Sequence, residues 1–81
     1  MIATEAKLKQ VLADVFGVDA SVIDDNASVD SIAKWDSLNH LNLVLALEEQ
    51  FKVSLSEEQI VEMMNYPLVR AVLQEHGVEF R

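Results

Sequence analysis

The chain has 81 residues, with 14 acidic and 6 basic side chains and a net charge of −8. A chain of this length can build one modest core but not two, so we expect a single domain over 1–81. The acidity disfavours nucleic acid and anionic membranes as partners, because both repel a negatively charged protein. The absence of cysteine excludes disulfides and thiolate metal sites.

No segment has the features of a signal peptide or a membrane span. The first ten residues mix Glu5 with Lys7 and Lys9, and the longest apolar run, 43–47, is far too short to cross a bilayer. Glycine and proline are scarce, which favours helix along most of the chain. We therefore expect an all-α, cytoplasmic protein without membrane insertion.

The first predicted helix begins after a capping residue, Thr4, and ends at Gly17. Its apolar residues recur at three- and four-residue spacing and form one stripe. They are Leu8, Val11, Leu12, Val15 and Phe16. This spacing predicts a helix with one face on the core.

Residues 18–35 are predicted to form a long loop, because the segment is rich in Asp, Ser and Asn. Four scattered apolar residues are expected to pin it to the core. They are Val22, Ile23, Val29 and Ile32. A loop of this length indicates either a function or an unrecognised short turn. Trp35 is expected to anchor its end by packing, with contact to a bound group as the alternative.

The second predicted helix runs from Ser37 to Phe51, with Asp36 as its N-cap. Ser37 therefore lies where backbone N–H groups have no partner inside the helix and where the peptide dipoles add partial positive charge. A phosphate ester on its hydroxyl would lie in a favourable field. The sequence offers no base and oxyanion donors that would make Ser37 a catalytic nucleophile.

This helix carries two apolar stripes at about 100° per residue. The first is an ordinary core stripe made of Leu43, Val44, Leu47 and Phe51. The second lies on a separate arc beside Ser37 and is here called the leucine strip: Leu38, Leu41 and Leu45. Either the first helix or the loop covers the leucine strip, or the strip is exposed for docking to a partner.

Two shorter helices follow. Ser56-Glu57-Glu58-Gln59 is a capping box and predicts a short third helix with Ile60, Val61, Met63 and Met64. Pro67 suits the first turn of a fourth helix that ends near Gly77. Its predicted inner face consists of Leu68, Val69, Val72 and Leu73. Both ends of the chain are expected to be mostly helical.

Two candidate metal sites are rejected. A calcium loop counted from Asp24 has Val29 at the sixth position and Trp35 at the twelfth, where glycine and glutamate are required. His40 and His76 are far apart in sequence and lack a ligand at metal-binding spacing. We therefore expect no metal.

The triplet Asp36-Ser37-Leu38 belongs to a longer pattern. It is followed by Leu43, Val44, Leu47, Glu48, Glu49 and Phe51. It is preceded by Asp25-Asn26-Ala27-Ser28, and Val53-Ser54-Leu55-Ser56-Glu57-Glu58 comes after it. Together these segments cover practically the whole chain and resemble the acyl carrier protein family, in which the serine of an Asp-Ser-Leu triplet carries 4'-phosphopantetheine.

The resemblance implies a small four-helix bundle of acyl-carrier type, with a long loop between helices 1 and 2 and a short third helix. It implies a carrier rather than an enzyme, expected to be free-standing and monomeric. Ser37 would be the attachment site, flanked by Asp36 and Leu38. A phosphopantetheinyl transferase would supply the group from coenzyme A, and the thiol of the group would hold acyl chains as thioesters.

The resemblance also implies partners and an acyl pocket. The partners would be acyl-loading and acyl-transferring enzymes with basic docking surfaces. The expected docking residues are Leu38, Leu41, Leu45, Glu48 and Glu49. A loosely packed core could shelter the acyl chain, with plain core filling as the alternative. The expected pocket residues are Leu47, Ile60, Met63, Met64 and Val69.

The chain departs from the family in two places. Asn39, His40 and Asn42 stand where fatty-acid carriers usually have acids, which favours a narrower partner set in a specialised lipid, polyketide or cell-envelope pathway. Ile32-Ala33-Lys34-Trp35 lacks the usual glycine before the triplet, which leaves the loop geometry open. An aminoacyl or peptidyl carrier is an alternative, although its Gly-Gly-His-Ser motif is absent. An unmodified helical interaction module is another.

Overall fold

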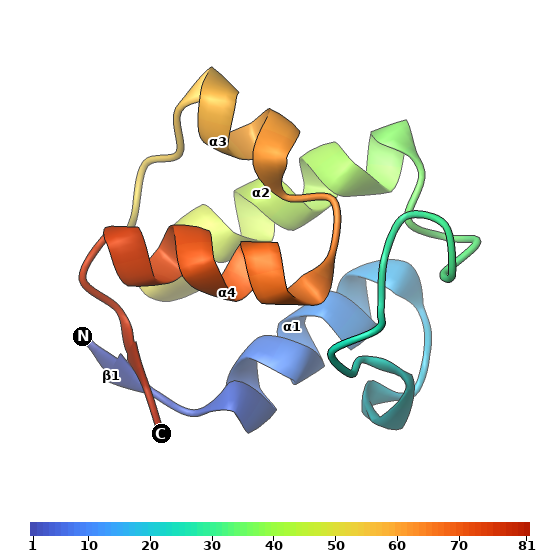
Figure 1. Ribbon diagram of the computed structural model, residues 1–81, viewed down its shortest axis with the longest axis horizontal. Helices are drawn as coiled ribbons and strands as arrows, with labels where there is room; N and C mark the ends of the chain where they lie inside the picture. The colour runs from blue at the N-terminus through green and yellow to red at the C-terminus, as the bar shows by residue number, and fades with distance from the viewer.

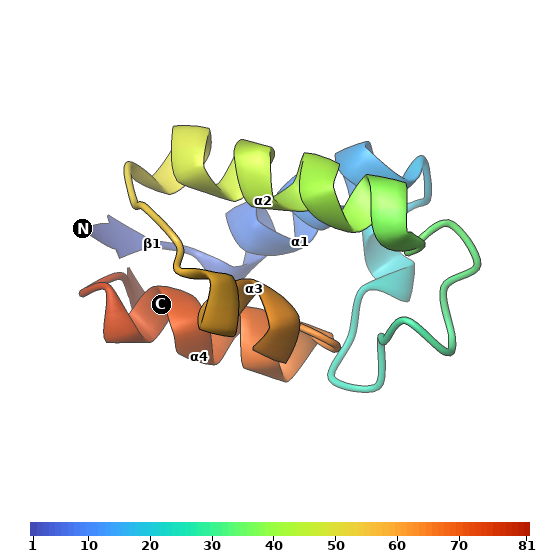
Figure 2. The ribbon, with the colours of Figure 1, turned by 90° about the horizontal axis from the view of Figure 1, so that it is seen from above.

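The computed structural model describes residues 1–81 and contains four helices: α1 (Glu5–Phe16), α2 (Ser37–Phe51), α3 (Glu57–Glu62) and α4 (Tyr66–Glu75). α1 packs against α2, while the short α3 lies beside α4 (Figure 1). Seen from above, the long loop before α2 lies at one end of the bundle and both termini lie at the other (Figure 2). The predicted small helical bundle is confirmed. None of the helices is long and apolar enough to span a bilayer.

The helix boundaries follow from local capping. The Thr4 hydroxyl accepts the N–H of Lys7 at 3.1 Å, and Gly17 ends α1 in the left-handed conformation at φ 66°. The predicted capping box of α3 is present, with both reciprocal hydrogen bonds formed. Asn65 caps α4 through the N–H of Leu68. α3 ends at Glu62, earlier than predicted, so both methionines follow the helix.

The core consists of nineteen buried residues, all apolar or aromatic, and the loop contributes to it. Ile23 and Ile32 are buried as predicted, whereas Val22 is exposed on a short 3-10 helix, η1 (Ala20–Val22). η1 is the short turn that the length of the loop had indicated. Hydrogen bonds join the loop to the segment after α3 and to the first residue of α4, from Val29 N–H to the Met64 carbonyl and from Tyr66 N–H to the Ala27 carbonyl.

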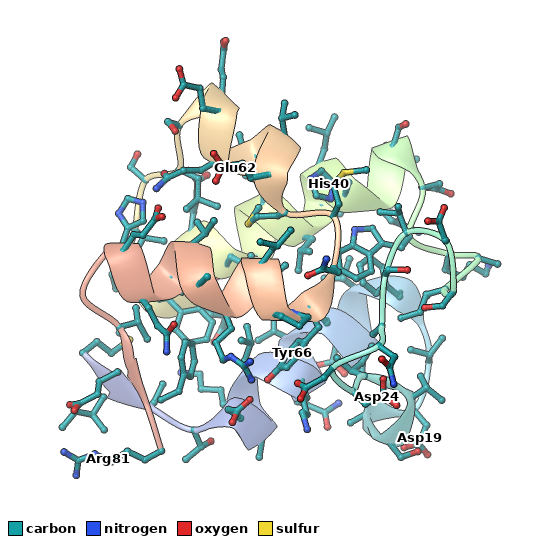
Figure 3. The ribbon with its side chains drawn as sticks, in the orientation of Figure 1. Asp19, Asp24, His40, Glu62, Tyr66 and Arg81 are labelled. Carbon is teal, nitrogen blue, oxygen red and sulfur yellow. The ribbon has the colours of Figure 1, made fainter.

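α4 differs from its prediction at two positions. Leu68 was expected on the inner face but is exposed, whereas Tyr66 is fully buried. The Tyr66 side chain points from α4 toward α1 (Figure 3), where its hydroxyl donates to Glu5 at 2.9 Å. Arg70 donates to the same carboxylate at 2.5 Å. This polar contact fastens α4 to α1 at the edge of the core.

These contacts shift the ionisation of both partners. The hydrogen bond from Arg70, followed by that from Tyr66, lowers the pKa of the Glu5 carboxyl below its ordinary value of 4.5. Burial, and then the hydrogen bond to Glu5, raises the pKa of the Tyr66 hydroxyl. The pair is therefore most stable with Glu5 charged and Tyr66 protonated.

The two ends of the chain form strands rather than helix. β1 (Ile2–Ala3) pairs in parallel with β2 (Glu79–Phe80), with Ile2 opposite Glu79. The Glu79 N–H donates to the Met1 carbonyl at 2.8 Å and the Arg81 N–H to the Ala3 carbonyl at 2.9 Å. The expectation of helical ends is therefore wrong, because the two terminal segments form backbone hydrogen bonds with each other.

Candidate functional site

Ser37 is the first residue of α2 and is exposed. The Asp36 carboxylate accepts the backbone N–H of Asn39 at 2.8 Å, and the Asp36 carbonyl accepts that of His40 at 2.8 Å. Asp36 thus fixes where the helix begins, as predicted for an N-cap. The serine hydroxyl lies in the first turn, at the positive end of the helix dipole.

The loop before Ser37 is held without a glycine. The Asn39 side chain donates from Nδ2 to the Lys34 carbonyl at 2.8 Å, and Asn42 donates to the Asn39 side-chain oxygen at 3.2 Å. Asn39 therefore braces the backbone just before the serine. A carboxylate could not make this contact, because it has no N–H to donate.

His40 joins three segments of the fold. Trp35 donates from Nε1 to His40 Nδ1 at 2.9 Å, and His40 Nε2 lies 2.7 Å from the Ile60 carbonyl oxygen. Since the indole nitrogen can only donate, Nδ1 accepts, and the proton of the neutral ring is on Nε2. These two hydrogen bonds, here called the His40 bridge, connect the loop, α2 and α3.

The indole of Trp35 anchors the His40 bridge to the core. Trp35 is buried, and its ring stacks on Phe16 of α1 with centroids 4.8 Å apart. The prediction that Trp35 packs as a loop anchor is confirmed. The hydrogen-bond partners of His40 were not predicted, because neither Trp35 nor Ile60 lies at helical spacing from it.

A surface pocket of about 520 Å³ opens beside the serine. It is lined by Val29, Trp35, Asp36, Ser37, His40, Leu41 and Met64. Met64 was predicted in the core but is 47% exposed here, because it follows α3. Val29 and Met64 contribute to this pocket, and their sequence positions gave no sign that they would lie near Ser37.

The leucine strip is open to solvent. The exposed fractions are 69% for Leu38, 56% for Leu41 and 64% for Leu45. The first core stripe of α2 is buried, as predicted, so the helix has one packed face and one bare apolar face. The interpretation in which α1 or the loop covers the leucine strip is wrong. Val61 on α3 is a further exposed apolar side chain that the sequence did not single out as a site residue.

The two predicted docking acids differ in their surroundings. Glu48 is half-buried, and its carboxylate accepts the Leu55 N–H at 2.9 Å, which holds the connection between α2 and α3. Glu49 is exposed. One of the two carboxylates predicted for docking, that of Glu48, therefore already accepts a hydrogen bond within the fold.

The residues of the predicted acyl pocket do not lie together around one cavity. Leu47, Met63 and Val69 are fully buried, Ile60 is half-buried, and Met64 lies apart from them in the surface pocket. None of the pockets is lined by Leu47, Met63 or Val69. A chain could enter this part of the core only if side chains moved. No three His, Asp or Glu side chains lie close enough together to hold a metal ion.

Comparison with known proteins places this geometry in a family. The model of the phosphopantetheine attachment site matches residues 6–75. An acyl carrier protein of Chlamydia felis is 35% identical over 57 residues, which cover 70% of this chain and 73% of that protein. An acyl carrier protein of Solidesulfovibrio magneticus is 40% identical over 52 residues, covering 64% and 67%.

Two further relatives define the context. A non-reducing polyketide synthase of Didymella fabae is 31% identical over 85 residues, which cover 96% of this chain but only 3% of that protein. The solution structure of a holo acyl carrier protein from Geobacter metallireducens superposes with a TM-score of 0.78 at 26% identity, covering 89% of this chain and 83% of that one. This chain therefore belongs to the acyl carrier protein family, whose members are carriers with covalently attached 4'-phosphopantetheine rather than enzymes.

Proposed function

We propose that the Ser37 hydroxyl carries 4'-phosphopantetheine and that the protein presents acyl groups to partner enzymes. The observation that supports this most directly is an exposed serine at the first position of a fifteen-residue helix, next to an open pocket. The residues fit the group, since a phosphodiester at a helix start lies in a favourable field. When bound, the group would supply a thiol that holds acyl groups as thioesters.

The chain itself would contribute position rather than catalysis. In the loading step, the Ser37 oxygen forms a bond to the phosphorus next to the pantetheine of coenzyme A. The bond from that phosphorus to the neighbouring phosphate breaks, and adenosine 3',5'-bisphosphate leaves. The serine proton would be taken by the transferase. Asp36 and Asn39 hold the helix start and the preceding loop so that the hydroxyl stays accessible.

The leucine strip is proposed as the docking surface for the transferase and for acyl-handling enzymes. It lies on the same helix as Ser37, and three exposed leucines on one face exceed what a solvated helix needs. Glu49 and the net charge of −8 favour partners with basic surfaces. The early helix lacks acids at Asn39, His40 and Asn42, which supports a narrower partner set than that of a fatty-acid carrier.

The partner-set proposal has its own test. The loaded protein is offered to fatty-acid synthase enzymes beside a fatty-acid carrier, and elongation is measured. We expect markedly lower efficiency for this chain. Equal efficiency would refute the specialised pathway while leaving the attachment at Ser37 intact.

The attachment itself is tested by intact mass. The protein is incubated with coenzyme A and a broad-specificity phosphopantetheinyl transferase, and the mass is measured before and after. We expect an increase by one phosphopantetheinyl group in the wild type and in Ser54→Ala, an exposed serine after α2, and none in Ser37→Ala. A wild type that stays unmodified with several transferases would instead support the unmodified interaction module.

A further inference from the structure

We infer that the His40 bridge closes the direct route from Ser37 into the core, so that a tethered acyl group rests in the surface pocket. The protein would then serve short acyl groups rather than long alkyl chains. This inference rests on the proposed attachment at Ser37. It concerns where the cargo lies and how long it is, which the family membership does not determine.

The route is defined by helix geometry. Residues three or four apart line up along one side of a helix, so Ser37, His40 and Val44 form one row that leads on to Leu47. The distance along α2 from Ser37 to Leu47 is about 15 Å at 1.5 Å per residue. His40 stands in this row one turn after the serine. A phosphopantetheine arm that runs from Ser37 along α2 therefore meets the His40 ring before the acyl group at its end can reach the buried residues.

The His40 ring connects α2 to α3. It receives a hydrogen bond from Trp35 at 2.9 Å on one side and lies 2.7 Å from the Ile60 carbonyl on the other. The Trp35 end cannot easily give way, because its indole is buried against Phe16. Displacing His40 would remove the partner of the indole N–H of the buried Trp35 and of a carbonyl on the half-buried Ile60, which is unfavourable.

The surface pocket offers an alternative that requires no opening. Val29, Leu41 and Met64 give it apolar walls, and Ser37 lies at its edge. Its volume of about 520 Å³ accommodates an acyl group, but the pocket is open to solvent and buries such a group only in part. Each methylene that extends past the pocket would remain in water, since burial is what stabilises apolar groups. Long alkyl chains would therefore be poorly sheltered on this protein.

The chain contains two neighbouring reporters for the two locations. Met63 is fully buried in the core, Met64 lines the surface pocket, and Met1 is a remote reference at the N-terminus. The protein is labelled with ¹³C at the methionine methyl groups. It is then loaded by a transferase from coenzyme A, butyryl-coenzyme A or octanoyl-coenzyme A. Intact mass confirms the loading of each sample.

In the wild type we expect both acyl groups to shift the Met64 methyl signal relative to the sample loaded from coenzyme A. The Met63 and Met1 signals should stay in place. Cleavage of the two thioesters by hydroxylamine should proceed at rates within about twofold of each other, because both remain accessible to the reagent.

Two variants open the bridge. His40→Ala removes the ring, and Trp35→Phe removes the indole N–H while keeping an aromatic side chain against Phe16. In each variant, loading with octanoyl should shift the Met63 methyl signal. Hydroxylamine cleavage of the octanoyl thioester should slow at least about fivefold relative to the wild type, as expected when most molecules hold the chain inside the core. His76→Ala, an exposed histidine at the end of α4, should behave like the wild type.

The outcomes separate the two proposals. A wild type that gains no mass refutes the attachment at Ser37 and, with it, this inference. A loaded wild type in which octanoyl shifts Met63 as much as Met64 refutes the closed route alone, whether or not the variants fold. A His40→Ala variant in which octanoyl leaves the Met63 signal unmoved would show that His40 is not the barrier, and would overturn the inference as well.

Discussion

The two faces of α2 have similar compositions, but one is buried in the core and the other is exposed to solvent. One face places Leu43, Val44 and Leu47 in the core, while the other leaves Leu38, Leu41 and Leu45 in water. Five of these six residues are leucine, which favours helix, so helix propensity does not distinguish the faces. The difference arises from tertiary contacts, since α1 covers the first face and nothing in the fold covers the second.

Under the proposed function, this contrast separates folding from recognition on one element. The buried face fixes α2 to the bundle and thereby fixes the place of Ser37. The bare face stands next to the same serine and is available to partners. Changes to the two faces should therefore affect different measurements.

The largest expected effect is on the buried face. Leu47→Ala should lower the free energy of unfolding by about 2–5 kcal/mol, because it removes buried methyl groups and leaves a cavity. Leu45→Ala, two residues earlier on the exposed face, should change it by less than about 0.5 kcal/mol. Urea denaturation followed by circular dichroism measures both. Equal losses of unfolding free energy in the two variants would contradict the proposed difference between the faces.

The exposed face should respond in the opposite way. Leu45→Ala should lower kcat/KM for acyl transfer by a partner enzyme about tenfold, corresponding to about 1.4 kcal/mol of docking energy. Val22→Ala, which shortens an exposed apolar side chain on η1, serves as the control and should leave transfer unchanged. If both variants transfer at the wild-type rate, the leucine strip is not a docking surface.

A smaller effect is expected at the start of α2, which both faces share. Asp36→Ala removes the acceptor for the Asn39 N–H and should cost about 1 kcal/mol of stability. Asp36→Asn keeps an oxygen acceptor and should recover most of that loss. Thermal unfolding of the two variants gives the comparison. A similar loss in both would mean that the charge of Asp36, rather than its capping hydrogen bond, stabilises the helix.

The smallest effect is expected far from both faces, at the contact between α1 and α4. Because the pKa of Glu5 is lowered in the fold, its contribution is fully present above the ordinary value of 4.5 and is lost as the pH falls through the lowered value. The carboxylate is partly exposed, so the contribution should be below about 1 kcal/mol.

Unfolding experiments between neutral and acidic pH would measure this contribution. Glu5→Gln should lose less stability on acidification than the wild type, whereas Glu58→Gln, on the exposed side of α3, should follow the wild type. An acid response that is identical in all three proteins would show that the Glu5 contact does not contribute to folding.

Local signals in the sequence predicted most of the helical framework. Thr4, Asp36 and Ser56 each act within three residues of their partners, so their capping could be inferred from spacing alone. The core stripe of α2 was equally predictable from its period. The proposed attachment residue, Ser37, was inferred from a motif in the same short segment.

What the sequence did not reveal depends on contacts between distant segments. The pairing of β1 with β2 joins two-residue strands at opposite ends of the chain, too short for any pattern to show. The two hydrogen bonds of His40 were not predicted, because its partners come from the loop and from α3. Met64 was placed in the core, because the early end of α3 at Glu62 was not predicted.

We propose that one oxygen of this chain, that of the Ser37 hydroxyl, carries the phosphodiester. The most direct measurement is fragmentation of the intact loaded protein in a mass spectrometer, followed by assignment of the added mass to a residue. We predict that every fragment with the added phosphopantetheinyl group contains Ser37 and that fragments without Ser37 have their unmodified mass. Added mass on another hydroxyl, or on none, would contradict the account.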